Sequence, residues 1–149
     1  MKTIAHLSDL HFGRVDRVLL DPLRDTLERL LPDLVVVSGD LTQRAKSGQF
    51  RKARAWLDTL PKPQLVVPGN HDVPLYNPFM RFLAPFARFR DSFHPHLEPT
   101  HIDDEIAVVG VNTARSFVFK GGRINEEQVA RIRSQLDPLP DSHTKIPVS

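Results

Sequence analysis

Three short polar segments of the sequence contain side chains that can bind metal ions or transfer protons. The first is Asp9-x-His11, the second ends at Asp40 after a glycine, and the third is Asn70-His71-Asp72. Carboxylate, amide and imidazole groups together suit Mn, Fe, Co or Zn, and imidazole also exchanges protons near neutral pH. Each segment alone fits ordinary loop polarity or an Asx turn. Their joint occurrence favours a metal site.

Each polar segment directly follows an expected strand. Apolar runs typical of strands cover residues 4–8, 34–37 and 64–67. Asp40 lies 31 residues after Asp9, and Asn70 lies 30 residues after Asp40, which is the length of one strand–helix unit. Ligands of open α/β sheets bind beyond the carboxyl ends of the strands, so the metal-capable side chains should converge at one edge of a parallel sheet. If strand geometry persists through Asp9 and His11, both side chains point to the same side.

The rest of the sequence also predicts alternating helices and strands. Amphipathic helices are expected after Asp21-Pro22 and after Ser47, between the first three strands. A helical stretch should cover 79–93 with a break at Pro85, and a fourth strand should cover 106–111. A last helix should open at Asn125, and a further strand is expected to begin at residue 145.

The amino-acid composition excludes several classes of protein. The chain has 149 residues, 40% of them hydrophobic and 26% charged, which fits one globular domain. It contains no cysteine, which excludes disulfides, a thiol nucleophile and an iron–sulfur cluster. The net charge is only +2, which argues against a long nucleic-acid groove. The sequence has no long apolar run and no secretory signal pattern, so we expect a cytoplasmic protein that does not bind membranes.

The residues around the three segments also carry a resemblance. They read His6-Leu7-Ser8-Asp9-Leu10-His11-Phe12-Gly13, then Val37-Ser38-Gly39-Asp40-Leu41-Thr42, then Val67-Pro68-Gly69-Asn70-His71-Asp72-Val73-Pro74. This series resembles the first three motifs of the calcineurin-like metallophosphoesterases. It is most similar to the bacterial branch related to class III cyclic-nucleotide phosphodiesterases. The specific motifs span residues 1 to about 80.

The resemblance implies a fold and a set of residue roles. The implied fold is an αββα sandwich that holds two divalent metal ions about 3.5–4 Å apart. Asp9 and His11 would bind the first ion, Asp40 would bridge both, and Asn70 would bind the second. His71 would act as a general acid or stabilise developing charge, and Asp72 would orient it. The implied reaction is in-line attack on a phosphate ester by a metal-bound hydroxide.

The sequence also departs from the family pattern. Family members continue with a further histidine ligand and a Gly-His-x-His segment, whereas this chain has no Gly-His dipeptide and ends at Ser149. We therefore interpret residues 1–149 as a single, C-terminally truncated domain that provides only the N-terminal sheet with its flanking helices. The inner face of such a sheet would be bare and apolar, which predicts aggregation or oligomerisation through that face.

Two alternatives to a phosphodiesterase remain open. The missing last ligands allow a non-catalytic metal- or phosphate-binding remnant, and the same family includes nucleases. The substrate is expected to be a small phosphodiester or phosphomonoester. The histidines at 94, 96 and 101 lie in a proline-rich polar connection and favour a solvated loop over an accessory metal site. Arg81 and Arg88 likewise favour a solvated helix face over a phosphate contact.

Overall fold

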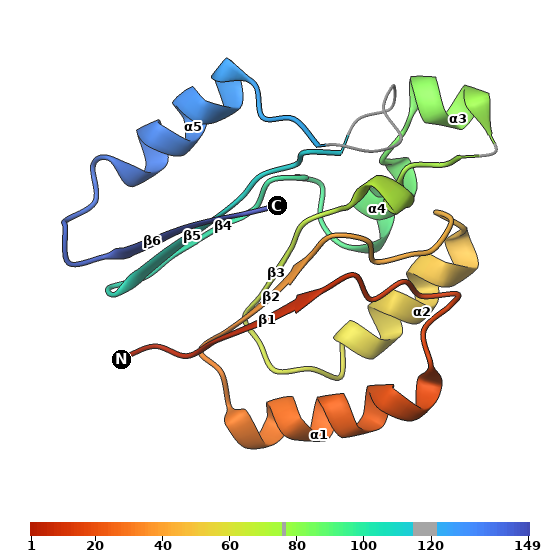
Figure 1. Cartoon of the computed structure of the whole chain (residues 1–149), viewed down its shortest axis with the longest axis horizontal. Coiled ribbons are helices and arrows are strands. Elements are labelled where there is room, and N and C mark those ends of the chain that lie inside the picture. Colours follow the sequence, from red (N-terminus) through yellow and green to blue (C-terminus); the bar gives the residue numbers. More distant parts are fainter. Residues whose placement is uncertain (76, 115–121) are drawn as a thin grey trace.

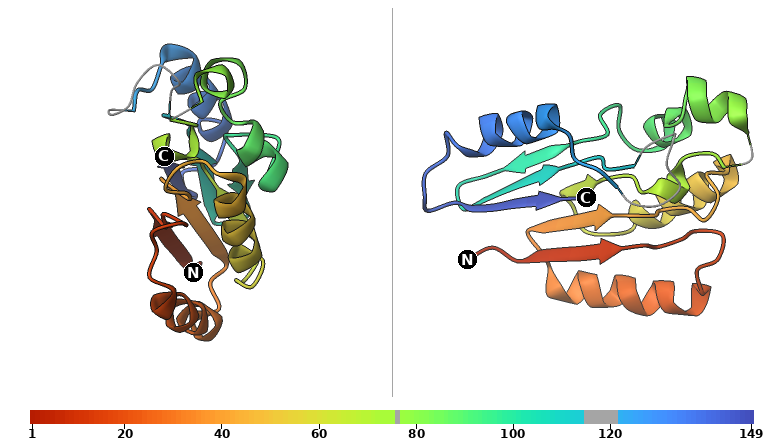
Figure 2. Two further views of the ribbon diagram at one scale, coloured as in Figure 1. Left: turned by 90° about the vertical axis from the view of Figure 1, so that its right-hand side faces the viewer. Right: turned by 45° about the horizontal axis from the view of Figure 1, so that its top comes forward.

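Two three-stranded sheets lie face to face between helices in the computed structural model, which describes residues 1–75, 77–114 and 122–149 (Figure 1). The layers run from helices α1 and α2 through the first sheet and the second sheet to helix α5, as Figures 1 and 2 show. This arrangement confirms the α/β class and the αββα layering predicted from the sequence.

The first sheet is parallel and has the order β1-β2-β3. Its strands are β1 (Ile4–Ser8), β2 (Leu34–Ser38) and β3 (Gln64–Val66), close to the three predicted strands. All five residues of β2 are buried, because this strand is covered on both faces. Since the three strands run in one direction, their carboxyl ends meet at one edge.

Helices α1 (Leu20–Leu30) and α2 (Ser47–Leu57) cover the outer face of this sheet. Val35 and Val37 of β2 belong to the same core as side chains from both helices. The short 3-10 helix η1 (Arg17–Leu19) feeds directly into α1. Helix α1 therefore begins earlier than the Asp21-Pro22 signal predicts, because η1 supplies the first turn.

The second sheet comes from the last third of the chain. It contains β4 (Thr100–Ile102), β5 (Ile106–Gly110) and β6 (Thr144–Val148), with β4 antiparallel and β6 parallel to β5. Helix α5 (Glu126–Leu136) packs on its outer face, where a small core forms from Ala107, Val109 and Leu136. As predicted, α5 opens at Asn125, whose side chain accepts a hydrogen bond from the Gln128 backbone.

The presence of this second sheet corrects the expectation that the chain supplies only the N-terminal sheet. Side chains of the two sheets share one buried core, made of Leu34, Val36, Leu65, Val67, Ile106 and Val108. The second sheet therefore covers the inner face of β2 and β3, while His6 and Ser8 on the same face of β1 stay exposed. The predicted bare, apolar inner face is wrong for β2 and β3, and the prediction of oligomerisation loses the observation on which it was based. The sequence pattern missed β4, whose three residues show no apolar alternation, and so did not reveal that the later strands pair with one another.

The segment between the sheets forms three short helices. These are η2 (Asn70–Asp72), α3 (Pro78–Leu83) and α4 (Ala87–Ser92), so the predicted helical stretch with a break at Pro85 is confirmed. Arg81 is buried and donates to the Pro74 carbonyl, while Arg88 donates a 2.7 Å hydrogen bond to the Ala45 carbonyl. The predicted solvated arginine face is therefore wrong, since both guanidinium groups bind backbone carbonyls.

Candidate metal centre

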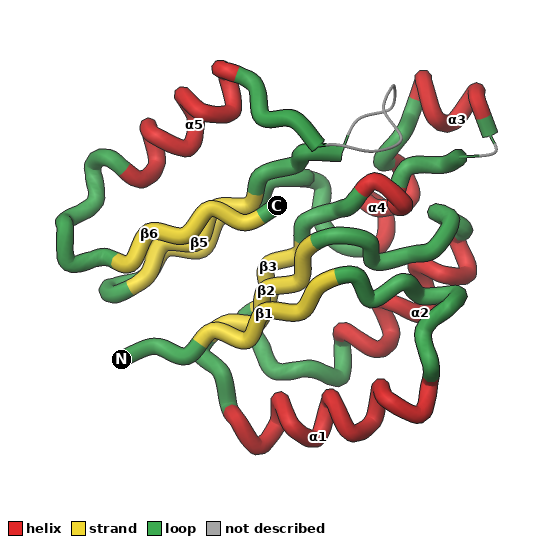
Figure 3. Tube along the Cα trace, in the orientation of Figure 1, coloured by secondary structure: helices red, strands yellow, loops and turns green. Residues whose placement is uncertain are grey.

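The loops that follow the three parallel strands form the candidate site, and Figure 3 shows them side by side at one end of the first sheet. The first loop leaves strand geometry at once. Asp9 has a φ of 55° and His11 a φ of 46°, which is left-handed backbone that non-glycine residues seldom adopt. The expected persistence of strand geometry through these residues is wrong. The sharp turn nevertheless brings both side chains towards Asp40.

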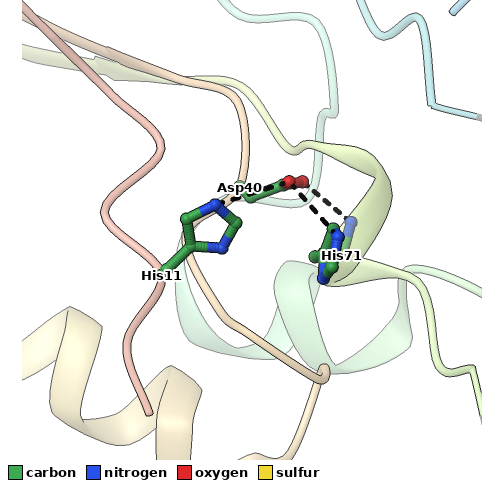
Figure 4. Close-up of side chains that lie close together, drawn as sticks. All are labelled: His11, Asp40 and His71. Atoms are coloured by element: carbon green, nitrogen blue, oxygen red, sulfur yellow. Dashed lines mark hydrogen bonds and ion pairs between the residues drawn. The ribbon is translucent and has the colours of Figure 1, made fainter. Parts of the chain in front are cut away.

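One side chain from each of the three loops contributes to a cluster of possible metal ligands. Ligand atoms of His11, Asp40 and His71 all lie within 4.8 Å of one another. Nε2 of His11 and Nε2 of His71 each lie 3.9 Å from Oδ2 of Asp40, as Figure 4 shows. The two imidazole rings stand edge to face, with centroids 5.3 Å apart. The convergence of side chains separated by some 30 residues, expected from the strand rhythm, is confirmed for these three.

Glycines at two positions let Asp40 lie close to the other loops. Gly39 has a φ of 74°, which turns the chain sharply just before Asp40. A Cβ atom at Gly69 would overlap Oδ1 of Asp40 and the backbone of Gly39 and Asp40. The backbone N–H of His71 instead approaches and donates a 2.8 Å hydrogen bond to Oδ1 of Asp40. Asp40 is buried, so its carboxylate is held in one orientation.

The ring of His71 is oriented by a backbone carbonyl. Its Nδ1 lies 2.9 Å from the carbonyl oxygen of Gln43. Because a carbonyl only accepts hydrogen bonds, Nδ1 carries the proton in this contact, which leaves the lone pair of a neutral ring on Nε2. Nε2 is the atom that faces Asp40. The arrangement presents His71 as a metal ligand or as a group that donates or accepts a proton on that side.

Asp72 has a different role from the one predicted for it. Its buried carboxylate accepts hydrogen bonds from the backbone N–H groups of Leu41, Thr42 and Gly69 and from the hydroxyl of Thr42. Burial raises the pKa of Asp72 to about 7, against the lowering effect of these four donors. Asp72 therefore joins the loop after β2 to the loop after β3 and does not itself hold the His71 ring.

Asp9 and Asn70, the other predicted metal ligands, lie beside the cluster. Oδ1 of Asp9 accepts a 3.4 Å hydrogen bond from the backbone N–H of Asp40, and the Asp9 side chain is exposed. Asn70 is exposed and directly precedes His71 in η2. Both residues therefore lie on the same loops as the three clustered side chains.

The donor set suits a divalent transition metal. Two imidazoles and one carboxylate within 4.8 Å match the mixed nitrogen and oxygen ligands that Mn, Fe, Co and Zn accept. Within residues 1–75, 77–114 and 122–149, no second group of three acidic or imidazole side chains is arranged in this way. His94 and His96 are exposed neighbours with ring centroids 5.2 Å apart, and His101 faces Asp103.

Sequence reasoning missed two residues that shape the centre. Thr42 is fully buried, and its hydroxyl also accepts a hydrogen bond from the Ala45 backbone. Gln43 orients His71 through its main chain. Thr42 lies within the second motif, two residues after the candidate ligand Asp40, so its hydroxyl could have been considered from the sequence. The contact of Gln43 could not, because every residue has a backbone carbonyl.

Comparison with known proteins places this geometry in context. The family model for calcineurin-like phosphoesterases matches residues 2–146. A glycerophosphodiester phosphodiesterase from Enterobacter lignolyticus is 27% identical over 96% of this chain and 54% of its own length. A probable glycerophosphodiester phosphodiesterase from Arcobacter nitrofigilis is 27% identical over 74% of this chain and 38% of its own length.

A shorter match concerns a probable cyclic nucleotide phosphodiesterase from Synechococcus, which is 30% identical over 48% of this chain and 32% of its own length. The matched regions thus span between 32% and 54% of these relatives. The described helices include none that is long and apolar enough to cross a membrane.

Proposed function

Because the chain belongs to the calcineurin-like phosphoesterase family, we propose that it contributes the metal centre of a metal-dependent phosphodiesterase. The observation that supports this most directly is the meeting of His11, Asp40 and His71 at the carboxyl edge of the first sheet. The phosphodiesterase names of the relatives favour a phosphodiester substrate over a monoester.

The site residues fall into two groups in this proposal. Asp9, His11, Asp40 and Asn70 would hold two divalent metal ions, and Mn, Fe, Zn and Co are the candidates that their donor atoms suit. Such ions would polarise the phosphoryl group and lower the pKa of a coordinated water. The backbone N–H of His71 keeps Asp40 oriented by its 2.8 Å hydrogen bond.

His71 handles charge and protons at the leaving group. With Nδ1 bound to the Gln43 carbonyl, its Nε2 is the atom available to the substrate. A protonated Nε2 donates to a phosphoryl or leaving-group oxygen and stabilises the negative charge that develops there. No covalent intermediate is needed in this scheme, so the scheme does not require a cysteine nucleophile.

Hydrolysis of bis-p-nitrophenyl phosphate in the presence of Mn tests the proposal. We expect turnover that a chelator abolishes and that added Mn restores. Asp40→Ala should abolish it as well, because it removes the carboxylate that the proposal assigns to the metal ions. Asp141→Ala removes one exposed carboxylate that does not belong to the cluster of His11, Asp40 and His71, and is the matched control.

Binding without turnover would overturn the catalytic proposal and identify a metal- or phosphate-binding module instead. Calorimetric titration with Mn separates the two outcomes, because a binding module still takes up the metal and still loses it on the Asp40→Ala substitution. Cleavage of single-stranded DNA in preference to small diesters would point to the nuclease branch of the family.

A further inference from the structure

A pocket of about 450 Å³ lies on the side of the β1–α1 loop that faces helix α2. Its lining includes the aromatic side chains of Phe12 and Trp56, and we call it the Trp56 pocket. It shares the β1–α1 loop with the metal centre, since Phe12 directly follows His11, but none of the clustered ligand side chains lines it. The proposed hydrolysis makes no use of it.

The floor of the Trp56 pocket is apolar and well anchored. Phe12 and Trp56 are both buried, and their ring centroids lie 5.9 Å apart at an angle of 49°. The indole N–H of Trp56 donates to the Leu20 carbonyl, so the polar atom of the ring is already satisfied. Val15, Leu20 and Ala55 complete the apolar lining. A ligand would therefore meet a preformed hydrocarbon surface.

Two cations stand at the edge of this apolar floor. Arg17 and Lys52 line the pocket together with the apolar residues, and the lining contains no acidic side chain. Both are exposed, and neither forms an ion pair with any residue in the described part of the chain, in contrast to Arg24 and Arg54, which pair with nearby aspartates. Asp16, the acid next to Arg17, accepts instead from the Val18 backbone.

From this combination we propose that the Trp56 pocket binds a small amphipathic anion, namely a sulfonate, carboxylate or phosphate attached to an aromatic or similarly compact apolar group. The apolar part would lie against the apolar lining of the pocket, while the anionic head would pair with Arg17 and Lys52. Charge complementarity decides the ligand class, because a neutral apolar molecule would leave both cations unpaired and a simple inorganic anion would make no use of the apolar lining.

The structure also links such a ligand to the metal centre. The backbone N–H of Phe12 donates a 2.8 Å hydrogen bond to the Leu41 carbonyl, and its carbonyl accepts from Gln43. The same segment that forms the pocket floor is thus bonded to the loop that presents Asp40 and orients His71. A ligand in the Trp56 pocket would therefore restrict the movement of the β1–α1 loop at Phe12, on the side opposite the metal centre.

Fluorescence of Trp56, the single tryptophan of the chain, provides a direct test that does not depend on activity. The probe is 4-ethylbenzenesulfonate, which has the required ring and charge and is not a phosphoesterase substrate. The full chain is titrated with this probe, with the neutral 4-ethylbenzenesulfonamide and with methanesulfonate, which lacks the ring. We expect a saturable change in emission with the aromatic sulfonate alone.

Substitutions then locate the site. Lys52→Ala and Arg17→Ala should each raise the dissociation constant of the probe about three- to tenfold, as loss of one charge-assisted contact predicts. Arg51→Ala removes the neighbouring exposed cation of α2, which does not line the pocket, and should change the constant by less than about twofold. Ala55→Leu adds bulk to the lining while keeping a strong helix former, and should abolish binding with an unchanged circular dichroism spectrum.

Several results would overturn the proposal. These are a linear, unsaturable emission change, equal binding of the sulfonamide and the sulfonate, or equal effects of Lys52→Ala and Arg51→Ala. Unaltered binding by a folded Ala55→Leu variant would do the same. If Ala55→Leu fails to fold, the comparison of Lys52→Ala with Arg51→Ala still decides the matter, because both positions are exposed.

Discussion

The two oxygens of Asp40 serve different parts of His71. Oδ1 accepts the backbone N–H of His71 at 2.8 Å, while Oδ2 lies 3.9 Å from Nε2 of the same residue. The first contact holds the two loops together and the second sets the spacing of the candidate ligand atoms. Asp40 therefore combines a structural contact with a place in the metal centre, and substitutions around it should separate these two contributions.

Replacing His71 by alanine should separate catalysis from metal binding. If His71 handles charge at the leaving group, His71→Ala lowers kcat on bis-p-nitrophenyl phosphate by about 10²- to 10⁴-fold and leaves the bound Mn unchanged. Metal content by mass spectrometry and steady-state kinetics measure the two effects. His94→Ala, at an exposed position, is the control. Equal loss of Mn and of activity would instead identify His71 as a metal ligand.

The hydroxyl of Thr42 should matter more than its methyl group. Thr42→Val keeps the shape but removes the bonds to Asp72 and the Ala45 backbone, and should lower the free energy of unfolding by about 1–3 kcal/mol. Thr42→Ser keeps the hydroxyl and should retain the activity of the parent. Urea unfolding and kcat are measured for both variants. Indistinguishable variants would show that the Thr42 hydroxyl adds nothing to the three backbone hydrogen bonds that Asp72 accepts.

The shared core of the two sheets can be tested by truncating one buried side chain. Leu34 is fully buried between the sheets, so Leu34→Ala should lower the free energy of unfolding by about 2–5 kcal/mol. Leu30→Ala, at an exposed leucine at the end of α1, should change it by less than about 0.5 kcal/mol. Denaturant unfolding measures both. A small effect at Leu34 would mean that the second sheet does not cover the first.

Acid should weaken the fold partly through Asp103 in the β4–β5 turn. Backbone N–H groups of Glu105 and Ile106 lower the pKa of Asp103 from 3.8 to about 2. Because the folded-state pKa is below the unfolded one, the carboxylate stabilises the fold above about pH 4, and this contribution is lost as the pH falls towards about 2.

The substitution Asp103→Asn keeps an acceptor for both N–H groups but removes the charge. We expect this variant to melt at a lower temperature than the parent at neutral pH and expect the difference to shrink towards about pH 2. Thermal unfolding followed by circular dichroism across this range measures it, with Asp141→Asn as the control at an exposed carboxylate. A difference that is the same at every pH would contradict the role of the charge.

Much of the candidate site was accessible from the order of residue types alone. Apolar runs followed by polar segments about 30 residues apart predicted parallel strands with carboxyl ends at one edge, and His11, Asp40 and His71 meet there. The reason is local: strand period, helix capping and the direction of parallel strands are all set by short-range backbone geometry.

The detailed geometry of the site and the presence of the second sheet were decided by the tertiary structure alone. The left-handed turn at Asp9 and His11, the contact of His71 with the Gln43 carbonyl and the bonds of Asp72 to the Thr42 loop depend on backbone atoms that every residue shares. The second sheet likewise depends on the pairing of β4 with β5, and the three residues of β4 show no alternation of apolar and polar side chains. Such contacts join segments far apart in the chain, so their partners are selected only when the whole core packs.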